Sequence, residues 1–138
     1  MIKKIIDMDK QETPIENSPF NEKELEHFRN KLHEEKKRAE QTIKDLKETL
    51  GDLNEAELDE KSSLDDHQGN IATDELEKET MYTMIEKEKK KIEKIIVALD
   101  RIADGNYGIC LATGKPIAKE RLEAIPYALY TVEAANEI

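Results

Sequence analysis

The chain has 138 residues, of which 39% are charged and 37% hydrophobic, with two Phe and no Trp. This composition cannot build a thick globular core and is typical of long exposed helices. Acidic residues outnumber basic ones 32 to 22, for a net charge of −10, which argues against direct sequence-specific DNA binding because that requires clustered Lys and Arg.

A single cysteine excludes an intramolecular disulfide framework and suits a reducing compartment. The first residues, "MIKKIIDMDK", lack the long apolar core of a signal peptide. No window of the sequence is apolar enough to cross a bilayer. We therefore expect a soluble, cytoplasmic protein that has no membrane partner.

Residues 1–20 combine a short apolar patch with a polar stretch that contains two prolines, a pattern that predicts a flexible N-terminal arm. Asn21 then follows as a predicted helix N-cap. Glu22 and Glu24 fall in the first turn, where the helix dipole favours acidic side chains.

Two amphipathic helices are predicted after the arm, the first to about residue 58 and the second from about Thr73 to Asp104. Apolar residues recur every seven positions in the first, and in the second they alternate between steps of four and three, which is the coiled-coil pattern. The positions are Leu25, Leu32, Ala39, Leu46 and Leu53 in the first helix, and Met81, Ile85, Ile92, Ile95, Leu99 and Ile102 in the second, where the polar Glu88 occupies one further seam position. Gly105 suits a left-handed C-terminal cap.

A polar connection joins the two helices and predicts an antiparallel coiled-coil hairpin over residues 21–104, with its tip at about 59–72. Two helices packed against other chains are the alternative. Asp65, Asp66 and His67 lie at the tip and have the ligand types to hold a divalent cation, although such a run is more often a solvated turn.

Residues 105–138 differ from the predicted helices in sequence pattern, because glycines and prolines interrupt short apolar stretches. They predict a small loop-rich C-terminal module, of a size that usually needs a metal or a disulfide to stay folded. The expected fold class is therefore mainly α, a long antiparallel helical hairpin followed by this module.

The order of motifs resembles the DksA/TraR family of bacterial regulators over about residues 22–136. The motifs are "DDHQGNIATDELEKE" at the tip, then "DGNYGIC", "TGKPI" and "RLEAIP". Family members bind zinc with two Cys-x-x-Cys pairs, and those four positions correspond here to Cys110, Thr113, Thr131 and Ala134.

Only one of these four positions carries a thiol, and one thiolate cannot close a structural zinc site. The resemblance thus implies a degenerate zinc-finger-like module with no metal and no other cofactor. Apolar side chains must replace the metal, with Tyr107 and Ile109 expected against Leu99 and Ile102. Cys110 is then either a small buried hydrophobic residue or a free reactive thiol.

The resemblance implies a function in transcription. Family members insert the hairpin into the secondary channel of RNA polymerase and alter transcription without catalysing a reaction, in some cases together with the alarmone ppGpp, which leaves an alarmone open as a ligand here. Their tip carries Asp-x-x-Asp, which falls on His67 and Asn70. The partner-binding residues expected at the tip are Asp65, Asp66, His67, Asn70 and Asp74.

A second class of function remains open: a repurposed coiled-coil module, stress-associated or self-associating, with no role at polymerase. A helix seam that pairs with another copy would favour it. An enzyme is not expected, because the sequence has no nucleophile–base pair and no phosphate-binding glycine loop.

Overall fold

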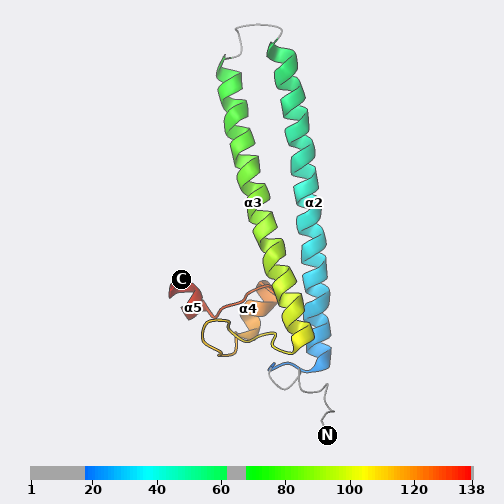
Figure 1. Cartoon of the computed structure of the whole chain (residues 1–138), viewed down its shortest axis with the longest axis vertical. Helices are drawn as coiled ribbons and strands as arrows, with labels where there is room; N and C mark the ends of the chain where they lie inside the picture. The colour runs from blue at the N-terminus through cyan, green and yellow to red at the C-terminus, as the bar shows by residue number, and fades with distance from the viewer. Residues whose placement is uncertain (1–17, 62–67, 138) are drawn as a thin grey trace. The chain divides into compact units, whose positions relative to one another are not determined.

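The computed structural model describes residues 18–61 and 68–137, with side chains described for 18–55 and 75–137. Four helices follow in chain order (Figure 1): α2 (Glu22–Lys61), α3 (Gln68–Asp104), α4 (Lys119–Ala124) and α5 (Val132–Glu137). The first two form an antiparallel helical hairpin and the last two belong to a loop-rich C-terminal module. The predicted fold class is confirmed.

Residue contacts divide the chain into two compact units. One contains both ends, Met1–Lys36 and Glu93–Ile138, and the other is Lys37–Ile92; we call them the terminal unit and the middle unit. Most of the predicted arm, residues 1–17, lies outside the described residues. Its last three residues, 18–20, are described, and both Ser18 and Phe20 are buried in the terminal unit.

Helix α2 begins with a reciprocal capping arrangement. Asn21 Oδ1 accepts a hydrogen bond from the Glu24 backbone N–H at 2.8 Å, and Glu24 Oε1 accepts one from the Asn21 N–H at 3.0 Å. Two backbone donors that no helical carbonyl can reach are thereby satisfied. The predicted N-cap at Asn21 is confirmed.

Helix α3 ends in a Schellman motif centred on Gly105, whose φ is 82°. The Gly105 N–H donates to the Ile102 carbonyl at 3.2 Å, and the Asn106 N–H donates to the Arg101 carbonyl at 2.8 Å. Glycine adopts this left-handed conformation without the steric cost of a Cβ atom. The predicted C-terminal cap is confirmed.

At their other ends the two helices extend further than predicted. α2 continues to Lys61 and α3 already begins at Gln68, so Thr73, the predicted start of the second helix, lies inside α3. Once a helix is nucleated, each added residue contributes a backbone hydrogen bond. That gain outweighs the weak helix preference of Gly69, Asn70 and Thr73 in this extension.

The core of the terminal unit joins both long helices to the C-terminal module. Leu32 of α2 and Ile95 of α3 are fully buried, as their heptad positions predict, and so is Phe28 of α2. The rest of the cluster is Phe20, Leu25, Ala98, Ile102, Tyr107, Cys110, Ile117, Leu122, Ala128 and Ala134. Tyr107 lies in this cluster with Ile102, and Leu99 packs against it, as expected, but Ile109 is not part of the cluster.

The middle unit has a thinner apolar seam. Ala39, Leu50 and Ile85 are buried, whereas Leu76 and Met84 are largely exposed. Among the described residues, none of the helices combines the length and the apolarity that crossing a membrane requires.

Candidate functional site: a knuckle-like module and its contacts

The first half of the C-terminal module is a tight turn that carries Cys110 and Thr113. The Cys110 N–H donates to the Lys115 carbonyl at 2.8 Å, and the Gly114 N–H donates back to the Cys110 carbonyl at 2.9 Å. An antiparallel bridge pairs Ile109 with Pro116. Gly114 has a φ of 74°, which explains why glycine follows Thr113. The backbone thus forms a knuckle of the kind that presents two side chains to a common point.

The second half of the module is the N-terminus of α5. Thr131 precedes this helix, and its Oγ1 accepts a hydrogen bond from the Ala134 N–H at 3.2 Å. A threonine in this position is a favourable N-cap. Ala134 is buried in the core of the terminal unit.

The two halves meet at Cys110. Thr131 Oγ1 lies 3.9 Å from Cys110 Sγ, within the range of a hydrogen bond to sulfur. Cys110 is only 2% exposed, so the expectation of a buried residue is confirmed. Burial raises the pKa of the thiol, but hydrogen bonds from the Thr113 side chain and from the backbones of Thr131, Thr113 and Ala112 outweigh it and lower the pKa to about 6. The sulfur is therefore hydrogen-bonded as well as buried.

The side chains at the four knuckle positions do not fit a zinc ion. Thr131 Oγ1 is already engaged with Cys110 and Ala134, and Thr113 Oγ1 accepts the Lys115 N–H at 3.2 Å. Ala134 has no donor atom. Tetrahedral structural zinc requires four thiolate or imidazole ligands. Among residues 18–55 and 75–137, whose side chains are described, no three His, Cys, Asp or Glu side chains gather where they could hold a metal.

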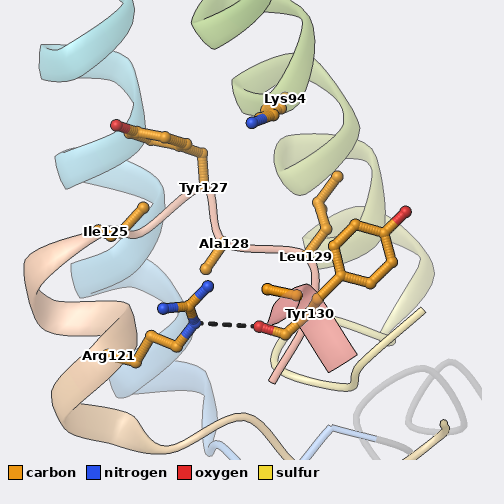
Figure 2. A pocket seen from close by; sticks show the side chains of 8 residues that line it. Lys94, Arg121, Ile125, Tyr127, Ala128, Leu129 and Tyr130 are labelled. Carbon is orange, nitrogen blue, oxygen red and sulfur yellow. Dashed lines mark hydrogen bonds between the residues drawn. The ribbon is translucent and has the colours of Figure 1, made fainter. Parts of the chain in front are cut away.

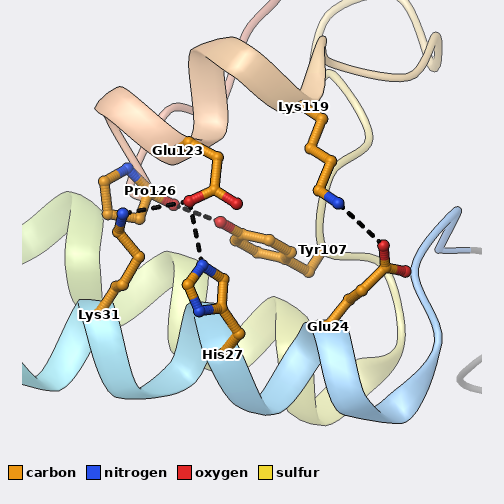
Figure 3. Close-up of polar contacts among 7 residues, drawn as sticks. All are labelled: Glu24, His27, Lys31, Tyr107, Lys119, Glu123 and Pro126. Atoms are coloured by element: carbon orange, nitrogen blue, oxygen red, sulfur yellow. Dashed lines mark hydrogen bonds and ion pairs between the residues drawn. The ribbon is translucent and has the colours of Figure 1, made fainter.

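Charged groups connect α4 to α2 inside the terminal unit (Figure 3). The Glu123 carboxylate accepts hydrogen bonds from His27 Nε2 at 3.0 Å and from Lys31 Nζ at 3.2 Å, while Lys119 Nζ donates to Glu24 Oε2 at 3.1 Å. The imidazole of His27 is half-exposed, as its charged neighbours in sequence suggest, but it also has a partner that they do not reveal. Its partner lies 96 residues away, and no local signal identifies it.

A surface pocket of about 220 Å³ lies beside α4 and was not predicted. Figure 2 shows Lys94 and Arg121 at its rim, with Arg121 Nε donating to the Tyr130 carbonyl at 3.0 Å. The other lining residues are Ile125, Tyr127, Ala128, Leu129 and Ala135. Two cations and two tyrosine rings thus line one small cavity.

The five predicted tip residues are not brought together by the described structure. Asp65, Asp66 and His67 lie outside the described residues. Asn70 and Asp74 lie in the first two turns of α3, where side chains are not described. Their role in binding stays a prediction.

An antiparallel helical hairpin followed by a knuckle-like module defines a class of coiled-coil proteins with a zinc-finger-like domain. Residues 105–138 match the model of the prokaryotic dksA/traR C4-type zinc finger. The chain is 38% identical over 122 residues to the RNA polymerase-binding transcription factor DksA of Caulobacter vibrioides, covering 88% of this chain and 80% of that protein. It is 31% identical to general stress protein 16O of Bacillus subtilis, covering 86% and 71%.

Two solved structures are similar over most of the chain. Transcription factor DksA2 from Pseudomonas aeruginosa has a TM-score of 0.67 and 30% identity, covering 85% of this chain and 84% of that one. The RNA polymerase-binding protein Dks from Chlamydia trachomatis has a TM-score of 0.52 and 25% identity, covering 86% and 91%. The chain belongs to the DksA/TraR family.

Proposed function

We propose that this protein is a non-enzymatic transcription regulator that acts in the cytoplasm by binding RNA polymerase through its helical hairpin. The observation that carries the proposal is the extent of the similarity. The match to the polymerase-binding relative extends over 88% of the chain, so it spans the hairpin as well as the C-terminal module.

The part that contacts polymerase in this proposal is the hairpin tip at about residues 59–72, which includes the ends of α2 and α3 and would insert into the secondary channel. Asp65, Asp66 and Asp74 supply negative charge there, and carboxylates change the electrostatic environment of a nearby divalent cation. His67 and Asn70 stand where related proteins carry two aspartates. Because a neutral amide acts on a cation only weakly, we expect polymerase binding with an altered effect on transcription.

A second function is favoured by one specific observation in the middle unit. A groove of about 470 Å³ is lined by Leu46, Leu76, Glu77, Thr80, Met81 and Met84, and Leu76 is 64% exposed. Exposed apolar surface often marks a site of protein–protein contact. In this alternative the groove is covered by a second copy of the chain, and the protein is a self-associating module.

The deciding experiment is co-purification with core RNA polymerase from the host. Three chains are compared: the wild type, a tip variant with residues 65–70 replaced by Gly and Ser, and a control with Lys44→Ser and Lys47→Ser on exposed positions of α2. We expect the wild type and the control to co-purify with polymerase and the tip variant to lose this binding.

Binding by all three chains would place the contact away from the tip. If none of the three chains binds polymerase, self-association is tested by analytical ultracentrifugation. A dimer that Leu76→Glu converts to a monomer would favour the self-associating module.

A further inference from the structure

A module of this size needs an additional stabilising interaction, because a few dozen loop-rich residues bury too little apolar surface to fold alone. In zinc fingers the metal supplies that stabilisation. Here the four knuckle positions cannot hold zinc, so another feature of this chain must do so.

The segment of residues 18–20, which lies outside the C-terminal module in sequence, is packed against it. Ser18 is only 8% exposed. Its Oγ donates a hydrogen bond to the Tyr107 carbonyl at 2.7 Å and accepts one from the Phe20 N–H at 3.3 Å. The first bond joins residues 89 positions apart, so this contact closes most of the chain into one loop.

Phe20 supplies the apolar part of the same contact. Its ring centroid lies 5.1 Å from that of Phe28 in α2 and 6.0 Å from that of Tyr107. These separations are typical of favourable aromatic pairs. Phe20 thus packs against the long helix and the C-terminal module together.

Gly108 shows how closely the segment approaches. A Cβ atom at this position would lie 2.6 Å from Phe20 Cε2, a distance that real Cβ atoms essentially never show. Gly108 also has a φ of 89°. Gly114 has a similar positive φ but nothing within 4 Å of an added Cβ. The two glycines therefore share the backbone requirement, and only Gly108 is also required by the ring of Phe20.

Tyr107 links residues 18–20 to the rest of the C-terminal module. Its side chain is fully buried, its ring centroid lies 5.3 Å from that of Phe28, and its hydroxyl donates to the Pro126 carbonyl at 2.8 Å. Figure 3 shows this hydroxyl directed at Pro126, just beyond α4. One residue thus joins residues 18–20, helix α2 and the segment that leads to α5.

We propose that the C-terminal module folds without a metal ion, and that residues 18–20, seated on Tyr107 and Gly108, are the staple that takes the metal's place. The proposal is independent of polymerase binding. It concerns what holds this chain together, and it predicts that a segment N-terminal to the hairpin controls the order of the knuckle.

The metal half is tested on the full chain, expressed with added zinc and analysed by elemental analysis and thermal unfolding with and without EDTA. We expect the wild type to carry less than about one-tenth of an equivalent of zinc and its melting temperature to be unchanged by the chelator, unlike a metal-dependent fold. One equivalent of zinc, with a melting temperature that falls in EDTA, would overturn the proposal.

The matched positive control restores the ligands by Thr113→Cys, Thr131→Cys and Ala134→Cys. We expect this variant to bind one zinc ion and to become sensitive to EDTA. A variant that keeps the amide NMR spectrum of the wild type but takes up no zinc would contradict the knuckle geometry on which the proposal rests.

The staple half is tested by a double-mutant cycle between Phe20→Ala and Gly108→Ala, with Gly114→Ala as the control that adds positive-φ strain alone. We expect Gly108→Ala to lower the melting temperature more than Gly114→Ala does. In the Phe20→Ala background that excess should disappear. Equal effects of the two glycine variants, or an excess that persists without the ring, would overturn the proposal.

Hydrogen exchange separates a local effect from general destabilisation. In Phe20→Ala we expect the amides of Cys110 and Ile117, both hydrogen-bonded in the knuckle, to lose protection by more than about tenfold relative to amides of the middle unit. Equal loss in both units, or no loss, would contradict the proposed staple.

Discussion

The carboxylate of Glu123 in α4 lies 3.0 Å from Nε2 of His27 in α2, and Lys31 reaches the same oxygen at 3.2 Å. One acidic side chain on a six-residue helix thus bridges two basic residues one turn apart. Because these groups are half-exposed, the bridge contributes little energy but fixes how α4 lies against α2.

The bridge makes stability depend on pH in the acidic range. Hydrogen bonds from His27 and then Lys31 lower the pKa of Glu123 below its ordinary value of 4.5. A depressed folded-state pKa stabilises the fold above the unfolded pKa, and this stability is lost as the pH falls through the folded pKa. We expect the melting temperature to fall below about pH 4.5, with a shallower fall in Glu123→Gln. Glu120→Gln on the same helix is the control, and it should follow the wild type.

The ionisation of Cys110 provides a second pH-dependent prediction. Burial is outweighed by hydrogen bonds, which lower its pKa from an ordinary 9.0 to about 6, so we expect the folded state to hold a thiolate at neutral pH. The resulting stability is fully present above about pH 9 and is lost as the pH falls through about 6. Thiolate absorbance in the ultraviolet should therefore titrate near pH 6 in the wild type.

Thr113→Val removes the side-chain hydrogen bond to this sulfur and should move the midpoint to higher pH. Thr49→Val, at an exposed position of α2, should leave the titration midpoint unchanged. A thiol that titrates at an ordinary value in the wild type would contradict the hydrogen-bonded sulfur that the structure shows.

The core contact of α4 is predicted to be the most sensitive apolar position of the C-terminal module. Leu122 is fully buried, and removing a buried leucine side chain to alanine costs about 2–5 kcal/mol. Urea denaturation of Leu122→Ala should show a loss of this size. Leu111→Ala, at a residue 47% exposed, should cost less than about 0.5 kcal/mol, and equal losses at the two positions would contradict the burial pattern.

The N-terminus of α2 offers a test of local structure. Asn21→Ala removes the acceptor for the Glu24 amide and should lower the free energy of unfolding by about 1 kcal/mol. Asn30→Ala, at an exposed site inside the same helix, should be neutral or slightly stabilising because alanine is the better helix former. Equal melting temperatures for wild type and Asn21→Ala would show that the cap is not formed in solution.

Local chemistry made much of the fold predictable. The seven-residue recurrence of Leu25 and Leu32 identified positions that are buried, because helical periodicity places them on one face. Asn21 and Gly105 marked a helix start and a helix end, since both caps depend on a residue and its immediate neighbours. The resemblance to the family implied the knuckle positions, and the residue types at those positions implied their poor fit to zinc.

The sequence by itself therefore determined the helical hairpin, its caps, the family and a knuckle that lacks zinc ligands, because each depends on residues close together in the chain. Only the tertiary structure decided that Ser18 and Phe20 seat on Tyr107 and Gly108, that His27 pairs with Glu123, and that hydrogen bonds lower the pKa of Cys110. Except for the hydrogen bonds that Cys110 receives from Ala112 and Thr113, these contacts join residues far apart in sequence. Their energies depend on distances of a few ångströms, which no local pattern encodes.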